Sequence, residues 1–491
     1  MKGGIKFDFK HNKLLTENKI KSFEKVNAVK IFLSEGGYKT KTKVKAGDVV
    51  KAGQVIAERE DGFPIFASVS GKVISAENDF IKIENDFKSA KKTLRKITQT
   101  PQNVKKRIKD AGIVCARGEA LYNKLNGIKN LVLNICESED YLDCESTIAI
   151  NKTSQVLKGT IILAKALGLN RFNVAIERGS NEAIPALKRG ISELDFNIIF
   201  DILPNIYPIG NDKIVSSEVL GKKIDFTKSL GEQEILVIDA MVALAIYEAV
   251  KLGKPFYERV VTISGRAIKK QVNVMVKNGT TFASALAYVG GEVFDKGRID
   301  DFEKLKEDRA EQLEKYALTC LSVEERTKDK NNPKLKEDIE RLKELKKQYN
   351  FKAKKFNKEL KAKAKEIKVD FKDSLIKLVK GGPMVGEAVE DLETPCTLST
   401  KGMLFLSKEE CYLDYPTACI KCGKCIDVCP VKINPIKLEY LGEMGKFNEC
   451  KANGVNRCIE CGACSFICPA RRDLKASVQI IKCKLKEGEN E

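Results

Sequence analysis

The sequence predicts a multidomain α/β protein with a small cysteine-rich module at its C-terminus, and three observations lead to this fold class. The chain has 491 residues, a length that usually corresponds to roughly three or four domains. Between residues 105 and 250, apolar strand-like segments alternate with helical ones, which indicates a parallel sheet with right-handed crossovers. Near the C-terminus, eight of the 16 cysteines fall into two copies of one spacing.

The N-terminal part, residues 27–85, reads as short strands joined by turns. Apolar residues alternate through residues 44–56, with Gly47-Asp48 and Gly53-Gln54 at the turns, and residues 67–73 repeat the theme. This pattern is similar to a biotinyl/lipoyl-type barrel-sandwich module. The hairpin Arg59–Gly62 contains no lysine for a carrier group, so we expect a structural module rather than a swinging arm.

The middle of the chain predicts an α/β domain. Strands are expected at residues 128–135, 172–176 and 197–203, with helices at 148–167 and 181–189. Ligands of such sheets bind at the carboxyl ends of the strands. A small α+β unit follows, with strands at 259–264 and 272–276 and a helix at 281–289.

Residues 301–370 differ from the rest in composition. Of these 70 residues 37 are charged, against 32% for the whole chain. The break Asn331-Asn332-Pro333 predicts two helices, each about 45 Å long at 1.5 Å per residue. An apolar stripe runs along the second helix. Three alternatives stay open: a solvated insertion without function, a docking arm for a partner, and partial disorder.

The two cysteine runs share the spacing Cys-x2-Cys-x2-Cys-x3-Cys-Pro. This run holds [4Fe-4S] clusters in two-cluster ferredoxins, and its fourth cysteine ligates the other cluster. We expect two clusters that pass electrons one at a time. One would be held by Cys419, Cys422, Cys425 and Cys468, and the other by Cys458, Cys461, Cys464 and Cys429.

Other readings of these cysteines are weak. Zinc sites use pairs of Cys-x-x-Cys or mixed Cys/His sets, and a third cysteine at the same step followed by Cys-Pro is atypical of zinc. A disulfide framework needs an oxidising compartment, and the charged start of this chain resembles no signal peptide. The single histidine, His11, nearly excludes histidine-based metal sites and general bases.

The formal net charge is +19. Such a charge suits an anionic membrane surface or an acidic redox partner, and a lysine-rich background is the plainer explanation. No nucleic-acid motif with interleaved aromatic residues is present, so no nucleic acid is expected as a partner. The most apolar stretch, residues 235–250, contains Asp239 and Glu248 and is too short to span a bilayer. Any membrane association is therefore expected to be peripheral.

The order of these parts resembles the C subunit of the Rnf ion-translocating electron transport complex, over nearly the whole chain. The eight cysteines carry most of the resemblance, and shorter segments in the same order add to it. These segments are Gly3-Gly4-Ile5, His11-Asn12-Lys13, the turns at Gly47 and Gly53, Tyr207-Pro208-Ile209-Gly210 with Lys213, Ala245–Val250, Gly253-Lys254-Pro255, Arg259–Gly265 and Gly381-Gly382-Pro383-Met384.

The resemblance implies five parts. Residues 1–100 would form the barrel-sandwich domain, and residues 101–252 a Rossmann-like α/β domain similar to the NADH-binding flavoprotein subunit of respiratory complex I. Residues 253–300 and 371–400 would form a β-grasp domain of the soluble-ligand-binding (SLBB) type, with the charged helical hairpin 301–370 inserted in it. Residues 401–491 would form the two-cluster ferredoxin-type module.

The function implied is that of a peripheral subunit on the cytoplasmic side of the plasma membrane. The complex is an ion-translocating oxidoreductase that exchanges electrons between ferredoxin and NAD(H) and couples this to Na⁺ or H⁺ transport. Implied partners are the other subunits, ferredoxin or NADH, and implied cofactors are two [4Fe-4S] clusters, with FMN and NADH in the middle domain.

The expected flavin loop departs from the family pattern. Cys115 and Arg117 stand where glycines are expected, and glycines let the backbone approach a phosphate closely. We therefore keep both alternatives, binding and loss of FMN and NADH. The candidate residues for that site are Gly112, Arg117, Gly118, Lys124, Glu137 and Glu139.

Two other functions remain as alternatives. The first is a soluble relative of the same architecture that carries electrons to a reductase of the cobalamin or amino-acid type. The second is a scaffold that holds clusters and partners without flavin or NADH chemistry, and the altered loop favours it over a true dehydrogenase.

Overall fold

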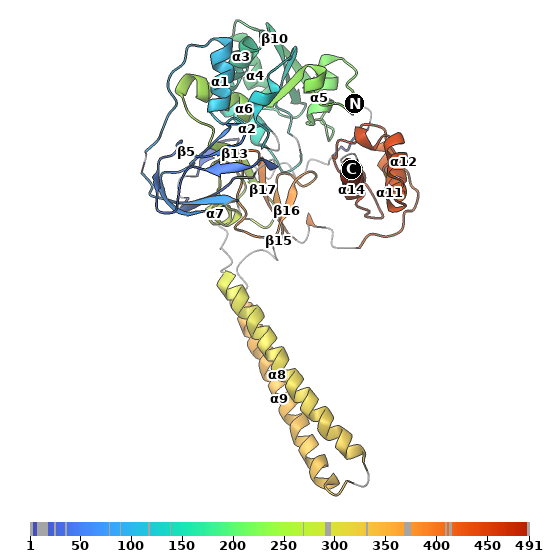
Figure 1. The fold of residues 1–491 in the computed structure, drawn as a ribbon. Coiled ribbons are helices and arrows are strands. Elements are labelled where there is room, and N and C mark those ends of the chain that lie inside the picture. Colours follow the sequence, from blue (N-terminus) through green and yellow to red (C-terminus); the bar gives the residue numbers. More distant parts are fainter. Residues whose placement is uncertain are drawn as a thin grey trace. The chain divides into compact units, whose positions relative to one another are not determined.

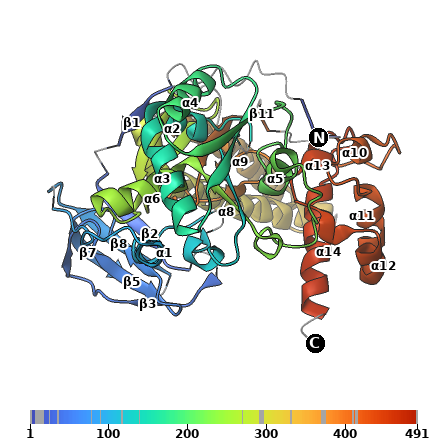
Figure 2. The same cartoon turned by 90° about the horizontal axis from the view of Figure 1, so that it is seen from above.

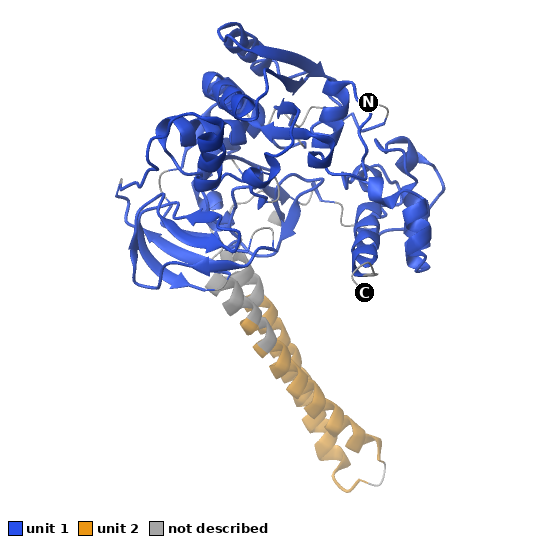
Figure 3. Cartoon of the chain, turned by 45° about the horizontal axis from the view of Figure 1, so that its top comes forward, with its two compact units in different colours: residues 1–290, 373–491 blue, residues 291–372 orange. Residues whose placement is uncertain are grey.

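The computed structural model describes residues 3–6, 18–23, 26–34, 37–77, 79–88, 90–115, 118–137, 139–268, 270–289, 296–329, 332–367, 375–407, 410–411 and 415–488. Two compact units divide the chain, as Figure 3 shows: residues 1–290 with 373–491, and residues 291–372.

The N-terminal module is a sandwich of two small antiparallel sheets. One contains β2 (Ala28–Phe32), β8 (Phe80–Asn85), β7 (Gly71–Ala76) and β4 (Val49–Val50). The other contains β3 (Thr40–Thr42), β5 (Val55–Arg59) and β6 (Pro64–Phe66). Buried and exposed side chains alternate along β7 and β8, as expected for strands with one face in a core. The expected barrel-sandwich fold is confirmed.

The middle domain is built on a four-stranded parallel sheet in the order β11-β10-β9-β12. The strands are β9 (Asn130–Asn134), β10 (Arg171–Glu177), β11 (Asn197–Leu203) and β12 (Ile235–Asp239). Their carboxyl ends meet at one edge, and the order reverses between β9 and β12.

Helices cover both faces of this sheet (Figures 1 and 2). The main core joins one face to α1 (Pro101–Asp110), α2 (Cys144–Asn151), α3 (Thr153–Ala166), α4 (Ala183–Ser192) and α6 (Ala240–Tyr247). A smaller core joins the other face to α5 (Asp212–Leu220). The single helix expected at 148–167 is wrong, because Lys152 leaves the helical region at φ −132° and separates α2 from α3.

A six-stranded mixed sheet lies where a β-grasp domain is expected, in the order β1-β14-β13-β17-β15-β16. Its strands are β1 (Ile20–Ser22), β13 (Glu258–Ser264), β14 (Val272–Lys277), β15 (Leu375–Lys380), β16 (Glu387–Val389) and β17 (Gly402–Ser407). Phe282 of α7 (Phe282–Tyr288) packs on Phe405 of β17, with ring centroids 5.5 Å apart. The expected limits were too narrow. β17 is buried throughout and lies between β13 and β15, beyond residue 400, and β1 comes from the N-terminal segment.

The second unit contains α8 (Lys296–Lys328) and α9 (Leu335–Ile367). The prediction of two helices separated near Asn332-Pro333 is confirmed, and each has 33 residues, or about 50 Å at 1.5 Å per residue. Val323 and Phe356 are buried between them. Arg309 of α8 pairs with Glu359 of α9 at 3.2 Å, so the two helices pack antiparallel.

The C-terminal module is helical. It contains α10 (Lys424–Asp427), α11 (Pro435–Glu443), α12 (Phe447–Ala452), α13 (Ala463–Phe466) and α14 (Leu474–Gly488). Leu438, Leu441, Cys450, Val478 and Ile481 form its core. Among the residues that the structure describes, no helix has the length and hydropathy needed to cross a membrane.

Candidate electron-transfer site

The eight cysteines of the two runs line two separate pockets in the C-terminal module. We call them the inner and the outer pocket. The inner pocket is lined by Cys429, Cys458, Cys461 and Cys464. The outer pocket is lined by Cys419, Cys422, Cys425 and Cys468. The grouping is crosswise, because each pocket takes three cysteines of one run and the fourth cysteine of the other.

The two runs have the same backbone conformation. Gly423 and Gly462 occupy equivalent positions with φ of 76° and 73°, and Lys421 and Glu460 both have φ of 56°. In each run this unusual turn directs an N–H to the first sulfur. Lys421 N donates to Cys419 Sγ, and Glu460 N donates to Cys458 Sγ, both at 3.4 Å. Such N–H groups stabilise the thiolate form that a cluster needs.

The pockets differ in their contact with solvent. Cys429 and Cys461 of the inner pocket are buried, whereas Cys419 and Cys422 of the outer pocket are exposed. Burial, and after it the charge of neighbouring cysteines that include Cys429, raises the pKa of Cys461 and Cys464. The four cysteines of the inner pocket are therefore close enough to interact as one set.

Tyr207 connects the inner pocket to the α/β domain. Its hydroxyl donates a hydrogen bond to the carbonyl oxygen of Cys461. Its backbone pairs with Ile5 in an antiparallel bridge, with both N···O distances at 2.8 Å. Gly4 N in turn donates to Val428 O at 2.8 Å. The N-terminal Gly-Gly-Ile segment thus fastens the cysteine module to the loop that follows β11.

The contact is close enough to require the glycine at residue 3. A Cβ on Gly3, whose φ is 100°, would lie 2.9 Å from the carbonyl oxygen of Cys429. A side chain at residue 3 would therefore collide with the backbone of Cys429.

A third, larger pocket lies over the carboxyl ends of β9, β10 and β11. Its lining includes Tyr207 and six acidic residues, Glu137, Glu139, Asp140, Asp143, Glu177 and Glu182. Burial raises the pKa of Glu177 to about 7. Burial and the neighbouring acidic groups raise the pKa of Glu137 well above its usual range. We refer to it below as the strand-end pocket.

The predicted flavin and NADH residues are not all brought together. Glu137 and Glu139 line the strand-end pocket, whereas Gly112, Gly118 and Lys124 are not among its lining residues. Arg117 lies outside the described residues. The candidate set is therefore divided between the pocket and the loop after α1.

The described part of that loop is engaged in contacts with the protein itself. A Cβ on Gly112 would lie 2.8 Å from the ring of Phe66. The carbonyl of Gly118 accepts two hydrogen bonds from the guanidinium of Arg59, both at 3.1 Å. Lys124 is ion-paired with Glu119. At Gly112, Gly118 and Lys124 the loop is therefore already in contact with the protein itself.

Glu139 also has a structural partner. Its Oε2 accepts from the N–H groups of Met384 and Val385 at 2.5 and 2.8 Å. The Met384 carbonyl accepts from Lys475 Nζ at 3.0 Å, and Lys475 lines the inner pocket. Glu139 thus holds the turn between β15 and β16, and that turn contacts the cysteine module.

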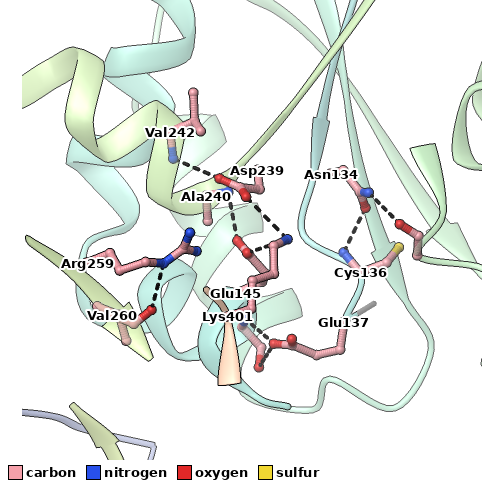
Figure 4. Close-up of polar contacts among 12 residues, drawn as sticks. Asn134, Cys136, Glu137, Glu145, Asp239, Ala240, Val242, Arg259, Val260 and Lys401 are labelled. Carbon is pink, nitrogen blue, oxygen red and sulfur yellow. Dashed lines mark hydrogen bonds and ion pairs between the residues drawn. The ribbon is translucent and has the colours of Figure 1, made fainter. Parts of the chain in front are cut away.

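The point where the strand order reverses is filled by a buried ion-pair cluster (Figure 4). Lys401 Nζ lies 2.8 Å from Glu145 Oε1 and 3.2 Å from Asp239 Oδ2. Burial alone would raise the pKa of Asp239. The positive charges of Lys401 and Arg259 outweigh this effect and hold that pKa below its ordinary value. The pKa of Lys401 is raised well above its ordinary value by the two carboxylates, against the effect of burial.

This cluster occupies the place where many parallel sheets bind phosphate. The N–H of Ala240 donates to Glu145 at 2.9 Å, and the N–H of Val242 donates to Asp239 at 2.8 Å. Two N–H groups at the N-terminus of α6 are therefore already bound by carboxylates, which disfavours an anion there. The strand-end pocket opens on the other side, over β9, β10 and β11.

The sequence alone does not reveal Tyr207 as a link to the cysteines, nor the buried cluster formed with Lys401, Glu145 and Arg259. The capping role of Asp239 can be predicted from the sequence, because an Asp between a strand and a helix is a usual N-cap. Lys401 and Glu145 carry no local signal, since they meet only through the fold.

Comparison with known families matches three parts of the chain. Residues 1–90 match the model of the RnfC barrel sandwich hybrid domain. Residues 108–248 match the Nuo51 FMN-binding domain, and residues 411–469 match the 4Fe-4S dicluster domain. The chain therefore carries a dicluster domain after a domain of the Nuo51 type.

Curated relatives match over most of the chain. The C subunit of the proton-translocating ferredoxin:NAD(+) oxidoreductase complex of Clostridium ljungdahlii is 26% identical over 84% of this chain and 78% of its own. The C subunit of the Na(+)-translocating ferredoxin:NAD(+) oxidoreductase complex of Acetobacterium woodii is 25% identical, over 89% and 86%. The C subunit of the ion-translocating oxidoreductase complex of Rhodobacter capsulatus is 26% identical, over 99% and 83%.

Among solved structures, an NAD+-reducing [NiFe]-hydrogenase in the air-oxidized state aligns with 38% of this chain and 39% of its own, at 13% identity and a TM-score of 0.34. This likeness is too slight to support an argument. The domain order, the two cysteine runs and these relatives agree, so the chain is similar over most of its length to the C subunits of Rnf-type complexes.

Proposed function

We propose that this chain is the peripheral electron-transfer subunit of a membrane-bound Rnf-type complex, an ion-translocating oxidoreductase that exchanges electrons between NAD(H) and ferredoxin. The observation that carries the proposal is the pair of pockets, each lined by four cysteines from both runs. We assign one [4Fe-4S] cluster to each pocket. Each cluster takes up and releases one electron.

The two pockets differ in their neighbours, and this difference suggests the order in which electrons pass through them. Tyr207 lines the strand-end pocket, and its hydroxyl is hydrogen-bonded to Cys461 of the inner pocket. The outer pocket has two exposed cysteines. We infer that electrons pass between the α/β domain and the inner pocket at one end, and between the outer pocket and a partner at the other.

The strand-end pocket is our candidate for the NAD(H) side. Parallel sheets bind ligands at the carboxyl ends of their strands. Glu137 Oε2 is buried there and has no hydrogen-bond partner among the described residues, so it could accept from a ribose hydroxyl. We assign no step to a flavin, because the described loop residues are engaged elsewhere.

The location also belongs to this proposal. We place the subunit on the cytoplasmic side of the plasma membrane, with other subunits of the complex and ferredoxin or NADH as partners. The alternative of a soluble carrier for a reductase is not favoured, because the relatives above are subunits of ion-translocating complexes.

The test is an anaerobic titration of the purified chain with NADH, with acid-released flavin quantified in the same sample. The proposal predicts that NADH bleaches the cluster absorbance and that Glu137→Gln weakens the NADH dependence. Clusters that dithionite reduces but NADH leaves unchanged, in the chain and in its complex, would remove NAD(H) from the proposal.

A further inference from the structure

The inner pocket carries one charge that no neighbouring charge cancels. Among the described residues that line it, two have charged side chains, Glu460 and Lys475. Glu460 is paired with Lys482 at 2.7 Å, so these two charges largely cancel. Lys475 is half-buried and forms no ion pair with another described residue. Its ammonium group donates to the carbonyl oxygen of Met384 at 3.0 Å, and a carbonyl leaves the positive charge in place.

The side chain of Lys475 is fixed at the pocket. It lies over Gly462, which follows Cys461 in the sequence. A Cβ on Gly462, whose φ is 73°, would lie 3.5 Å from Cδ of Lys475 and 3.0 Å from the carbonyl oxygen of Met384. The backbone N–H of Lys475 donates to Ser465 Oγ at 2.8 Å. Both ends of this residue are therefore held beside the inner pocket.

The carbonyl that binds the ammonium group belongs to the turn between β15 and β16, residues 381–386, which we call the glycine turn. Gly386 N donates to Gly382 O at 2.9 Å and closes the turn. Glu139 holds it from the side of the strand-end pocket, since its Oε2 accepts from two N–H groups of the turn. A Cβ on Gly382 would lie 2.3 Å from the carboxyl carbon of Glu139, so the close approach requires a glycine. Glu139 thus fixes the turn that presents the Met384 carbonyl.

We propose that Lys475 raises the reduction potential of the cluster in the inner pocket, and that Glu139 is a positioning residue that holds Lys475 in place through the glycine turn. The proposal rests on the proposed function, because it requires a redox cluster in the inner pocket. A reduced cluster carries one more negative charge than an oxidised one. A fixed positive charge beside it therefore stabilises the reduced form.

Burial makes this one charge effective. Cys429 and Cys461 are buried, and burial by itself disfavours the more highly charged reduced form. Lys475 offsets that effect, and its charge acts through a medium that contains little water. At the outer pocket, Lys421 and Lys437 are exposed, so water and salt screen their charges. A change at Lys475 should therefore move the inner potential and leave the outer one nearly unchanged.

The two ways in which Glu139 influences the cluster have opposite signs. Its own negative charge lowers the potential, so loss of that charge alone would raise it. Its hold on the glycine turn keeps Lys475 in place, so loss of that hold would lower the potential. The groups are close enough to interact, because burial raises the pKa of Glu139 while the N–H groups of the turn and the charge of Lys475 act against this.

The experiment is an anaerobic potentiometric titration of the full chain with its clusters, followed by electron paramagnetic resonance, with iron counted in each sample. The inner signal is identified by its loss in Cys429→Ser. Lys475→Met should lower the inner midpoint, so that at a fixed ambient potential the ratio of reduced to oxidised inner cluster falls roughly tenfold. Lys475→Arg should restore most of this ratio. Lys484→Met, with the same charge change at an exposed position of α14, should stay near the parent.

Variants of Glu139 test the positioning role. Glu139→Ala releases the glycine turn and should lower the inner potential, although it removes a negative charge. Glu139→Gln keeps an acceptor for the N–H groups and should not lower it. In the Lys475→Met chain, the addition of Glu139→Ala should bring no further decrease. A higher potential in Glu139→Ala than in the parent would overturn the proposal, since the carboxylate would then act through its own charge.

The proposal and the proposed function fail in distinguishable ways. An unchanged inner potential in Lys475→Met, with both clusters present, would overturn the role of Lys475 and leave the relay standing. Loss of the inner cluster itself in both Lys475→Met and Lys475→Gln would also overturn it, because the lysine would then support the ligands and not the potential. A chain whose pockets hold no reducible clusters would refute the proposed function itself.

Discussion

The hydroxyl of Tyr207 donates a hydrogen bond to the backbone carbonyl of Cys461, although the two residues are 254 positions apart in the chain. Tyr207 also lines the strand-end pocket, and Cys461 lines the inner pocket. One side chain therefore connects the two sites between which the proposed function moves electrons.

Removal of this hydroxyl should loosen the connection without removing a cluster. Tyr207→Phe leaves the buried Cys461 carbonyl without its partner, which should lower the free energy of unfolding by about 1–3 kcal/mol. Anaerobic denaturant unfolding and an iron determination measure the two effects. Ile209→Val, a mild change in the same pocket lining, is the control. A lost cluster in Tyr207→Phe would show that the tyrosine supports the ligands themselves.

Double substitutions of cysteines test the crosswise grouping. Cys429→Ser and Cys461→Ser should each lower the iron content from about eight to about four per chain, and the double variant should lose no more, because both residues serve one pocket. Cys429→Ser with Cys422→Ser should lose both clusters. Cys483→Ser, an exposed cysteine outside the two pockets, should keep all the iron. A further loss in the first double variant would separate Cys429 from the inner set.

Lys401 should be important for stability although it lies far from the cysteines in the sequence. Lys401→Met would leave Glu145 and Asp239 buried without their shared cation, which should destabilise the chain by about 3–5 kcal/mol. The triple variant Lys401→Met/Glu145→Gln/Asp239→Asn removes both charges and should recover much of the loss. Denaturant midpoints compare the variants, and no recovery in the triple variant would contradict the ion-pair explanation.

Glu177 predicts a pH dependence with a definite sign. Its pKa is raised by burial from 4.5 to about 7, so between these values the folded chain holds a proton that the unfolded chain has released. The free energy of unfolding therefore falls by up to about 3 kcal/mol as the pH rises from 4.5 to 7. Above pH 7 this contribution stays lost.

Glu177→Gln should remove this loss. The difference in melting temperature between variant and parent should favour the variant more at pH 8 than at pH 5. Glu182→Gln, an exposed change at the same pocket, is the control. A difference that does not vary with pH would contradict the raised pKa.

The helical hairpin should be dispensable for the clusters. Residues 291–372 form a compact unit of their own, so replacement of most of α8 and α9 by a flexible linker should leave the remaining unit folded. Iron content and the reduced spectrum should match those of the parent. A chain that no longer folds after this deletion would show that the hairpin is part of the core.

Much of the architecture could be predicted from the sequence because its signals are local. The limits of β11 follow from a run that is apolar from Ile198 to Leu203 except for Asp201, and the cysteine runs follow from their spacing. What the sequence could not reveal depends on distant partners. Lys401 and Glu145 meet only in the fold, and Glu139 binds a turn 245 residues away.

The flavin loop illustrates the same limit. The sequence shows that glycines are missing from the loop. It does not show the hydrogen bonds from Arg59 to Gly118 or the packing of Phe66 on Gly112. These contacts come from the barrel-sandwich module. The crosswise assignment of the cysteines stays a prediction about cluster ligands, which the two pockets support.

The most direct test of the relay is electron paramagnetic resonance of the fully reduced chain, with iron counted in the same sample. The account predicts about eight iron atoms per chain and a spectrum broadened by interaction between two neighbouring reduced clusters, which becomes a simple single-cluster signal in Cys429→Ser. Four or fewer iron atoms, or two signals that do not interact, would contradict it.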